Sequence, residues 1–296
     1  MIFHWWTLTK QMLSSYASVF REGLFAGQVA LVTGGGSGIG RCTAHELAAL
    51  GARVALAGRK ADKLAAVAAE IGAAARTYPC DIREEEAVRR MVESVLADFG
   101  RIDALVNNAG GQFGAPLETI SAKGWDAVVR TNLTGGFLAA RECYTQWMKA
   151  ADAGAIVNMI ADMWHGMPGM GHSGAARAGM LNFTETAALE WAPVRVNAVA
   201  PGWIASCGLD QYPPGMAEHI RALPRHVPLG RLGTEAEVSA GIVFLLSPAA
   251  AFISGSCLRV DGAVPSAKRV AGKVGTGKAT APFEGFHLAK RPKVLG

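Results

Sequence analysis

Apolar and polar positions along the chain change period repeatedly, from runs typical of buried strands to spacings typical of helices. Short apolar runs predict seven strands, at residues 28–32, 53–57, 75–80, 102–106, 155–160, 194–199 and 258–260. Apolar residues at helical spacing predict helices at residues 41–50, 61–71, 84–99, 125–148, 175–191 and 238–246, the last opened by a capping box at 234–237. This alternation predicts an α/β fold, a doubly wound Rossmann-type parallel sheet of seven strands with helices on both faces.

We expect a single domain, because no repeat or linker interrupts the alternation. It spans residues 23–264, with an N-terminal extension at 1–22 and a basic tail at 265–296. Of the chain's 29 basic and 24 acidic residues, the tail holds seven basic residues and one acid, which leaves 22 and 23 elsewhere. The net charge of +5 therefore belongs to the tail and does not indicate a nucleic-acid-binding body.

Composition narrows the class of protein further. Half of the residues are hydrophobic and 18% are charged, so a sizeable core is available. The five cysteines are scattered without a Cys-x-x-Cys pair, which predicts reduced thiols and neither a disulfide framework nor a metal site. Residues 1–13 lack the pattern of a signal peptide or membrane span, and the chain does not end in Ser-Lys-Leu. We therefore expect a cytoplasmic protein.

A glycine-rich turn follows the first predicted strand. Residues 33–40 read Thr-Gly-Gly-Gly-Ser-Gly-Ile-Gly and lead directly into a predicted helix. Such a turn leaves backbone N–H groups free at the helix N-terminus, and Gly34, Gly38 and Gly40 let a phosphate approach without meeting a Cβ. The alternative is an ordinary flexible turn, but the flanking strand and helix favour a dinucleotide site.

The residues after the second predicted strand bear on the choice of dinucleotide. An acid there would bind the ribose 2′-hydroxyl of NAD(H), whereas an arginine suits the 2′-phosphate of NADP(H). The chain has Arg59 and Lys60 at this point and no acid. Because a guanidinium can bind a phosphate through two hydrogen bonds, the pattern favours NADP(H) over NAD(H). The alternative is a solvated helix start.

Four segments in the right order resemble the short-chain dehydrogenase/reductase family. The glycine turn matches the family's Thr-Gly-x-x-x-Gly-x-Gly fingerprint, and residues 107–110 match its Asn-Asn-Ala-Gly segment. Residues 81–82 match its adenine contact, and residues 201–202 match its Pro-Gly turn beside the nicotinamide. The resemblance implies a nicotinamide cofactor held by Gly34, Ser37, Gly38, Ile39, Gly40, Arg59, Lys60, Asp81, Ile82, Asn108, Ala109, Gly110, Arg177, Pro201, Gly202 and Ile204.

The catalytic half departs from the family's pattern, which is a Ser, a Tyr, a Lys four residues later, and an Asn on a neighbouring helix. Asn132 matches the Asn, but Ala161 stands where the Ser is expected. Aligning Arg177 with the Lys leaves Ser173 at the Tyr position, and none of the four tyrosines lies four residues before a lysine. Arginine is a poor proton relay and serine a poor general acid, so Tyr–Lys carbonyl chemistry is not expected.

This departure resembles one branch of the family. Residues 172–179, together with Gly-Gly-Gln-Phe at 110–113, are similar to peroxisomal trans-2-enoyl-CoA reductases. The related 2,4-dienoyl-CoA reductases also carry Ser at the Tyr position but keep the Lys. The resemblance implies reduction of a conjugated C=C bond in an acyl-CoA by NADPH. Negative charge then develops on the thioester oxygen, where preorganised donors can stabilise it.

The candidate catalytic residues follow from this chemistry. Ser173 and His172 are candidate donors, Arg177 a contact to the ribose, and Asn132 a residue that positions a water. Asp162, just past the fifth predicted strand, is a candidate proton donor or relay. Structural alternatives are a helix N-cap for Ser173, a loop residue for His172 and a turn residue for Asp162.

The substrate end is predicted to be apolar. Residues 163–171 read Met-Trp-His-Gly-Met-Pro-Gly-Met-Gly and, with Trp203, Ile204 and Tyr212, indicate an adaptable wall for an extended substrate. Core packing is the alternative. The long segment 202–233 is typical of a mobile lid.

Two other functions remain open. One is an alcohol or aldehyde dehydrogenase for apolar or terpenoid substrates, similar to bacterial citronellol/citronellal dehydrogenases. The other is a catalytically weak cofactor-binding protein, because the Tyr–Lys pair is missing.

The resemblance also implies a homotetramer built on the helices near 125–148 and 175–191. Four basic residues of the tail are candidates for binding CoA phosphates: Lys268, Arg269, Lys273 and Lys278. The alternative is a solvated tail, or one that wraps around a neighbouring subunit.

Overall fold

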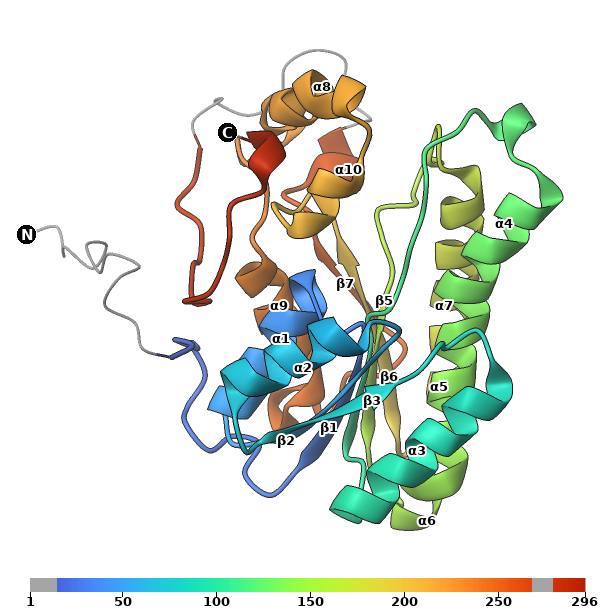
Figure 1. Cartoon of the computed structure of the whole chain (residues 1–296), viewed down its shortest axis with the longest axis vertical. Coiled ribbons are helices and arrows are strands. Elements are labelled where there is room, and N and C mark those ends of the chain that lie inside the picture. The colour runs from blue at the N-terminus through green and yellow to red at the C-terminus, as the bar shows by residue number, and fades with distance from the viewer. Residues whose placement is uncertain (1–14, 268–278, 296) are drawn as a thin grey trace, which may run out of the picture.

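The computed structural model describes residues 15–267 and 279–295. Its centre is a parallel seven-stranded sheet in the order β3-β2-β1-β4-β5-β6-β7 (Figure 1). This confirms the predicted doubly wound Rossmann-type fold. The strands are β1 Val29–Thr33, β2 Arg53–Gly58, β3 Ala75–Pro79, β4 Ala104–Asn107, β5 Ala155–Met159, β6 Arg195–Pro201 and β7 Cys257–Val260.

Helices cover both faces of the sheet. In Figure 1, α1, α2 and α9 lie on one side of the strands, and α3, α5 and α7 lie on the other. The helices are α1 Gly38–Ala49, α2 Ala61–Ile71, α3 Glu85–Phe99, α4 Ala122–Val129, α5 Gly135–Cys143, α6 Lys149–Ala151, α7 Gly171–Glu190, α8 Ala217–Ala222, α9 Glu235–Leu246 and α10 Val264–Ala267.

The strand sequences explain the two-sided core. Every residue of β1 is buried, and its side chains alternate between the two cores: Ala30 and Val32 join the α1/α9 side, Val29 and Leu31 the α3/α5 side. Along the chain, β2 pairs with β1 and β3 pairs with β2, and β4 then pairs with the opposite edge of β1. The β1/β4 junction is therefore the switch point, and ligands of such sheets bind at the carboxyl ends of the strands there.

The predicted single helix over 125–148 is wrong in detail. Two π-helical segments, Arg130–Thr134 and Tyr144–Met148, divide it into α4, α5 and α6. π-helical turns inside α-helices often mark functional sites, and Asn132 lies buried in the first one. The interruption therefore coincides with a predicted catalytic residue.

The segment 202–233, called the lid from here on, is not a structureless loop. It contains α8 and short 3₁₀ turns, the first at Cys207–Gln211. Ile220, Leu223 and Leu232 form a small buried cluster inside it. The lid therefore has a core of its own.

Residues 15–22 and the tail pack together on α1 and α9. Phe286 is 1% exposed, and its ring centroid lies 5.7 Å from that of Tyr16. The hydroxyls of Tyr16 and Ser18 donate to the Glu46 carboxylate in α1 at 3.1 and 2.7 Å, and Ser239 in α9 donates to it as well. Burial raises the pKa of Glu46, and the three hydroxyl bonds oppose that rise. The described part of the tail is thus anchored by an aromatic side chain.

The tail also reaches the lid. Arg221 Nε in α8 donates to the Val294 carbonyl at 2.7 Å, and the Val294 N–H donates to Asp210 Oδ1 at 3.0 Å. Val294 and Leu295 pack on the lid cluster. Residues 268–278, with the four basic residues proposed for CoA phosphates, lie outside the described residues. Within 15–267 and 279–295, no helix is both long and apolar enough to cross a bilayer.

Candidate functional site

The glycine-rich turn is fitted closely to the loop after β4. A Cβ would lie 2.8 Å from Asn108 Nδ2 if added at Gly34, and 2.4 Å from it if added at Gly40. Asn108 Nδ2 donates to the Thr33 carbonyl at 3.0 Å, and Thr33 Oγ1 accepts the N–H groups of Asn108 and Ala109 at 3.1 Å each. Gly34 also has a left-handed φ of +67°. Close approach and backbone conformation therefore both require glycine here.

The other side of the turn is open. Gly38 has a φ of +58°, and a Cβ there would meet nothing closer than Glu235 Oε1 at 3.8 Å. Ser37 is the N-cap of α1, but its side chain makes no capping hydrogen bond, and the first turn holds no acid. The N–H groups of the first turn, which includes Ile39, are therefore available to an anion, and the helix dipole favours negative charge there. The turn fits a dinucleotide diphosphate.

A buried carboxylate lies beside this turn. Glu235 begins α9 and is 9% exposed, and none of the hydrogen bonds or ion pairs among the described residues involves its carboxylate. Burial raises the pKa of Glu235 to about 7, and the positive charge of Arg41 opposes this rise. In its protonated form Glu235 places no negative charge next to a bound phosphate.

Basic side chains lie at the predicted adenine end of the site. Arg59 and Lys60 are exposed after β2, and Lys60 is the N-cap of α2, which also fits the alternative of a solvated helix start. Arg83 binds the Asp81 carboxylate with both Nε and Nη2, and this pairing is the largest cause of a lowered Asp81 pKa, to which Arg59 also contributes. Ile82 is buried against α5. The Asp81 carboxylate is therefore paired, and the acid nearest in sequence to Lys60 is Asp62 in the first turn of α2.

At the nicotinamide end, Arg177 is almost completely buried on α7. Its Nη1 donates to the Met159 carbonyl at the end of β5, at 2.5 Å, while its Nε has no partner among the described residues. A Cβ at Gly110 would lie 2.5 Å from Arg177 Nη2, so only glycine leaves room for this guanidinium. Burial lowers the pKa of Arg177 to about 10, which keeps it charged at neutral pH. The unused donor suits a ribose hydroxyl.

Asn132 is held by the loop after β4. Its Nδ2 donates to the Gly111 carbonyl at 2.8 Å, and its Oδ1 accepts the Gly111 N–H at 2.9 Å. Both ends of the amide therefore fix the backbone of residues 110–112. The positioning of a water by Asn132 stays a prediction.

The Pro-Gly turn, predicted to lie beside the nicotinamide, lies at the end of β6. Pro201 ends β6, and a Cβ at Gly202 would lie 2.8 Å from Asp261 Cα, so the backbones after β6 and β7 approach closely. Ile204 is buried and pairs with Gly233 across the base of the lid. These residues lie at the carboxyl ends of β6 and β7, beside the β5 end that Arg177 contacts.

The first turn of α7 carries the candidate donors. α7 begins at Gly171 with Met170 as its N-cap, earlier than predicted, so the N-cap interpretation of Ser173 is wrong. Instead, Ser173 Oγ donates to Gln112 Oε1 at 2.8 Å. His172 Nδ1 accepts the Ser173 N–H at 2.9 Å, and its buried Nε2 has no partner among the described residues. Ser173 and His172 are both fully buried.

The sequence did not identify Gln112 as a site residue and placed Tyr212 only in the substrate wall. Gln112 Nε2 donates to the Tyr212 hydroxyl at 3.2 Å, so Gln112 links α7 to the lid. The resemblance of residues 110–113 to enoyl-CoA reductases was a signal for Gln112. Nothing in the pattern pairs it with a tyrosine 100 positions away.

Exposed apolar side chains surround these donors. Phe113 is 42% exposed and its ring centroid lies 4.5 Å from that of His172. Leu117 is 64% exposed, and a Cβ at Gly171 would lie 2.7 Å from its Cδ1. The loop after β4 thus supplies an apolar surface next to the first turn of α7.

The segment after β5 contributes less to this surface than predicted. Met163 and Trp164 pack against the buried cluster of Ile160, so the core-packing alternative holds for both. Trp164 also stacks against Arg259, whose Cζ lies 5.1 Å from the ring centroid. Asp162, three residues after the end of β5, is half-buried.

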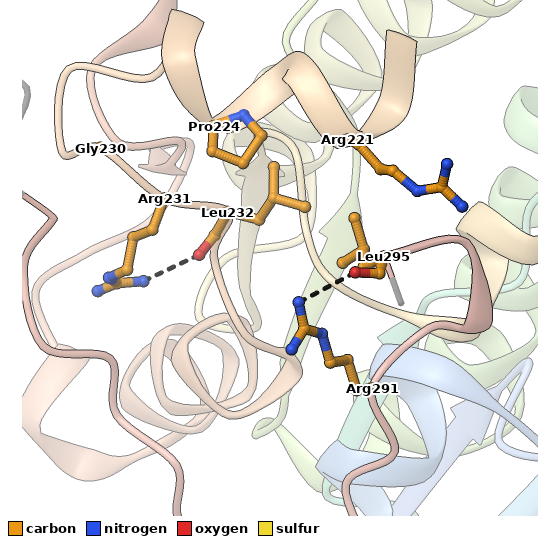
Figure 2. A pocket seen from close by; sticks show the side chains of 7 residues that line it. All are labelled: Arg221, Pro224, Gly230, Arg231, Leu232, Arg291 and Leu295. Carbon is orange, nitrogen blue, oxygen red and sulfur yellow. Dashed lines mark hydrogen bonds between the residues drawn. The ribbon is translucent and has the colours of Figure 1, made fainter. Parts of the chain in front are cut away.

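A separate pocket of about 330 Å³ lies between the lid and the tail (Figure 2). Arg221, Arg231 and Arg291 line it, and Arg231 is paired with Glu237 at 2.6 Å. Its lining contains none of the predicted cofactor or catalytic residues. Among the described residues no group of three His, Cys, Asp or Glu side chains could hold a metal ion.

The chain as a whole is similar to known proteins. The family model for enoyl-(acyl carrier protein) reductase matches residues 34–264. The chain belongs to the short-chain dehydrogenase/reductase family. This confirms the resemblance found in the sequence. It is an oxidoreductase family that uses a nicotinamide cofactor, and the open glycine turn and the unused Arg177 donor fit that cofactor.

Three relatives narrow the comparison. A probable 2,4-dienoyl-CoA reductase of Bacillus subtilis is 38% identical over 78% of this chain and 94% of its own length. A peroxisomal 2,4-dienoyl-CoA reductase of Danio rerio is 33% identical over 86% of this chain and 87% of its own. The structure of a citronellol catabolism dehydrogenase of Pseudomonas aeruginosa is 60% identical, covers 84% of this chain and all of its own, and has a TM-score of 0.76.

Proposed function

We propose that this chain is an NADP(H)-dependent reductase that acts on the conjugated C=C bond of an apolar, enoyl-CoA-like substrate. The feature that carries the proposal lies on α7, where aligning Arg177 with the family's Lys leaves Ser173, and no tyrosine, four positions before it. Such a site lacks the acid–base pair of carbonyl reduction. Similarity to proteins named 2,4-dienoyl-CoA reductases supports the same substrate class.

This reaction requires hydrogen-bond donors that the protein holds in fixed positions. When bound, the cofactor supplies hydride to Cβ of the substrate. The negative charge on the thioester oxygen is then stabilised by preorganised N–H and O–H groups. His172 supplies one: because its Nδ1 accepts a backbone N–H, the neutral ring carries its hydrogen on the unpartnered Nε2. Asp162 is the candidate proton donor or relay, and Phe113 and Leu117 offer apolar contact to the acyl chain.

NADP(H) is proposed over NAD(H). Arg59 and Lys60 are exposed after β2, where an acid would select NAD(H). Arg59 also acts on Asp81, so it lies at the adenine end. A guanidinium can bind a phosphate through two hydrogen bonds, which supports Arg59 as the contact to the 2′-phosphate.

A second function has its own support. The 60% identity with a citronellol catabolism dehydrogenase favours oxidation or reduction of an apolar terpenoid alcohol or aldehyde. The apolar surface around Phe113 suits such a substrate equally well.

One assay separates these functions. Purified protein is mixed with NADPH and, in turn, crotonyl-CoA, hexa-2,4-dienoyl-CoA and citronellal, and loss of NADPH absorbance is followed. Turnover of a thioester supports the proposal, and turnover of citronellal alone replaces it with the second function. No turnover despite saturable NADPH binding indicates the catalytically weak cofactor-binding protein. An Arg177→Met variant serves as the low-activity control.

The assembly and compartment proposed are a homotetramer in the cytoplasm. Membership of the short-chain dehydrogenase/reductase family supports a tetramer built on the helices near 125–148 and 175–191. All five cysteines are free thiols, which supports a reducing compartment.

A further inference from the structure

Three segments far apart in sequence meet in one chain of hydrogen bonds. Ser173 on α7 donates to Gln112 in the loop after β4, at 2.8 Å. Gln112 in turn donates from Nε2 to the hydroxyl of Tyr212 in the lid, at 3.2 Å. The chain therefore runs from the position of the family's catalytic tyrosine to a tyrosine on another element.

The direction of these bonds decides which hydrogen is left over. The single hydroxyl hydrogen of Ser173 is committed to Gln112 Oε1, which has no hydrogen of its own to give. The Tyr212 oxygen accepts from Gln112, and its own hydroxyl hydrogen has no acceptor among the described residues. Accepting a hydrogen bond on oxygen also polarises the phenol O–H. Of the two hydroxyls, Tyr212 is the one free to donate.

The lid fixes the ring of Tyr212 as well as its hydroxyl. The half-buried ring packs on the lid cluster of Ile220, Leu223 and Leu232. Two prolines follow, Pro213 and Pro214, whose rings restrict φ and stiffen this corner. A side chain held at both ends keeps its donor in place during the reaction.

We propose that Tyr212 is a catalytic residue, the hydrogen-bond donor to the substrate oxygen that becomes negative when hydride is added. Gln112 is its positioning residue, and Ser173 fixes the orientation of the Gln112 amide. The phenol that is missing from α7 is thus supplied by the lid. This assignment rests on the proposed function for its substrate, but it applies to any substrate oxygen that gains negative charge in this site.

The central test compares Tyr212→Phe with Ser173→Ala. Phenylalanine keeps the ring in the lid cluster and removes only the hydroxyl, so kcat should fall about 100-fold, the usual loss for one oxyanion donor. Ser173→Ala leaves the Tyr212 donor in place and should lower kcat by less than about 10-fold. Tyr144→Phe is the matched control, because Tyr144 stacks on Trp191 away from this chain of bonds and its loss should leave kcat unchanged.

The role of Gln112 has a separate readout. Gln112→Leu removes both hydrogen bonds and should lower kcat about 10-fold while the Kd for NADPH, measured by fluorescence, stays at the wild-type value. A merely structural residue would change NADPH affinity and thermal midpoint together with kcat.

The outcomes are distinct. If Ser173→Ala is as damaging as Tyr212→Phe, Ser173 is the donor and the proposal is overturned. The same holds if Tyr212→Phe behaves like Tyr144→Phe. If the wild-type protein reduces only citronellal, the substrate class proposed above is wrong, and the same variants compared on citronellal still decide on Tyr212. If no substrate is turned over with NADPH bound, both proposals are refuted.

Discussion

The substitution Glu235→Gln should stabilise the fold, and the gain in free energy of unfolding should be larger at alkaline than at acidic pH. The Glu235 carboxylate is buried at the start of α9, and burial raises its pKa from 4.5 to about 7. The folded state therefore binds more protons than the unfolded state between these values. Stability contributed by this group is present at low pH and is lost as pH rises through the folded-state pKa.

The magnitude follows from the two pKa values. Once the pH is well above both, the ionised carboxylate costs the folded state about 3 kcal/mol, and at pH 5 only about 1 kcal/mol of this cost is present. Glu235→Gln keeps the shape without the charge. The gain in free energy of unfolding over the wild type should thus be about 2 to 3 kcal/mol larger at pH 8 than at pH 5.

Urea denaturation followed by tryptophan fluorescence, at one protein concentration and both pH values, measures this difference. Glu237→Gln, two residues further along α9, is the control with the opposite sign. Burial alone would raise the pKa of Glu237, but hydrogen bonds from Arg231 and the Thr234 N–H outweigh it and lower the pKa. Both pH values lie above the unfolded-state pKa of 4.5, so the loss of this carboxylate should destabilise the fold by nearly the same amount at pH 8 and at pH 5. An equal gain from Glu235→Gln at both pH values would refute the reasoning.

Three further changes test other parts of the structure. Arg59→Ala should raise the Kd for NADPH about 10-fold and leave that for NADH unchanged, measured by fluorescence; equal weakening of both would argue against a 2′-phosphate contact. Phe286→Ala should lower the free energy of unfolding by about 3 to 5 kcal/mol in urea, because a fully buried aromatic ring is removed. A change below about 1 kcal/mol would mean that the tail is not anchored there. Arg177→Met should lower kcat/KM for NADPH at least about 10-fold with the circular dichroism spectrum unchanged; wild-type kcat/KM would remove Arg177 from the cofactor site.

The sheet and the cofactor turn were predictable because their signals are local. The first strand is a short run of buried, mostly apolar residues, and the glycine turn lies directly between this strand and a helix. The capping box at Thr234 and Glu237 likewise involves neighbours in sequence, and the structure confirms it.

Other features depend on contacts between distant residues. The hydrogen bond of Gln112 to Tyr212 spans 100 positions, and that of Arg41 to the Leu288 carbonyl spans 247. The π-helical turn at Asn132 escaped prediction because an extra residue in one turn barely changes the apolar period of a long helix. Ser173 before an alanine-rich helix is typical of an N-cap, and only the earlier start of α7 turns its hydroxyl to Gln112.

The tail contacts two separate regions, the helices near the glycine-rich turn and the lid. Phe286 packs with Tyr16 against α1 and α9, of which α1 begins at the glycine-rich turn, and eight residues later Val294 is hydrogen-bonded to the lid that carries Tyr212. The lid is therefore connected to the rest of the protein at both of its ends, and the tail holds it at a further point. A cut or a bulky label within residues 279–295 would act on the rate at which substrate enters and product leaves, at a distance from every atom that reacts.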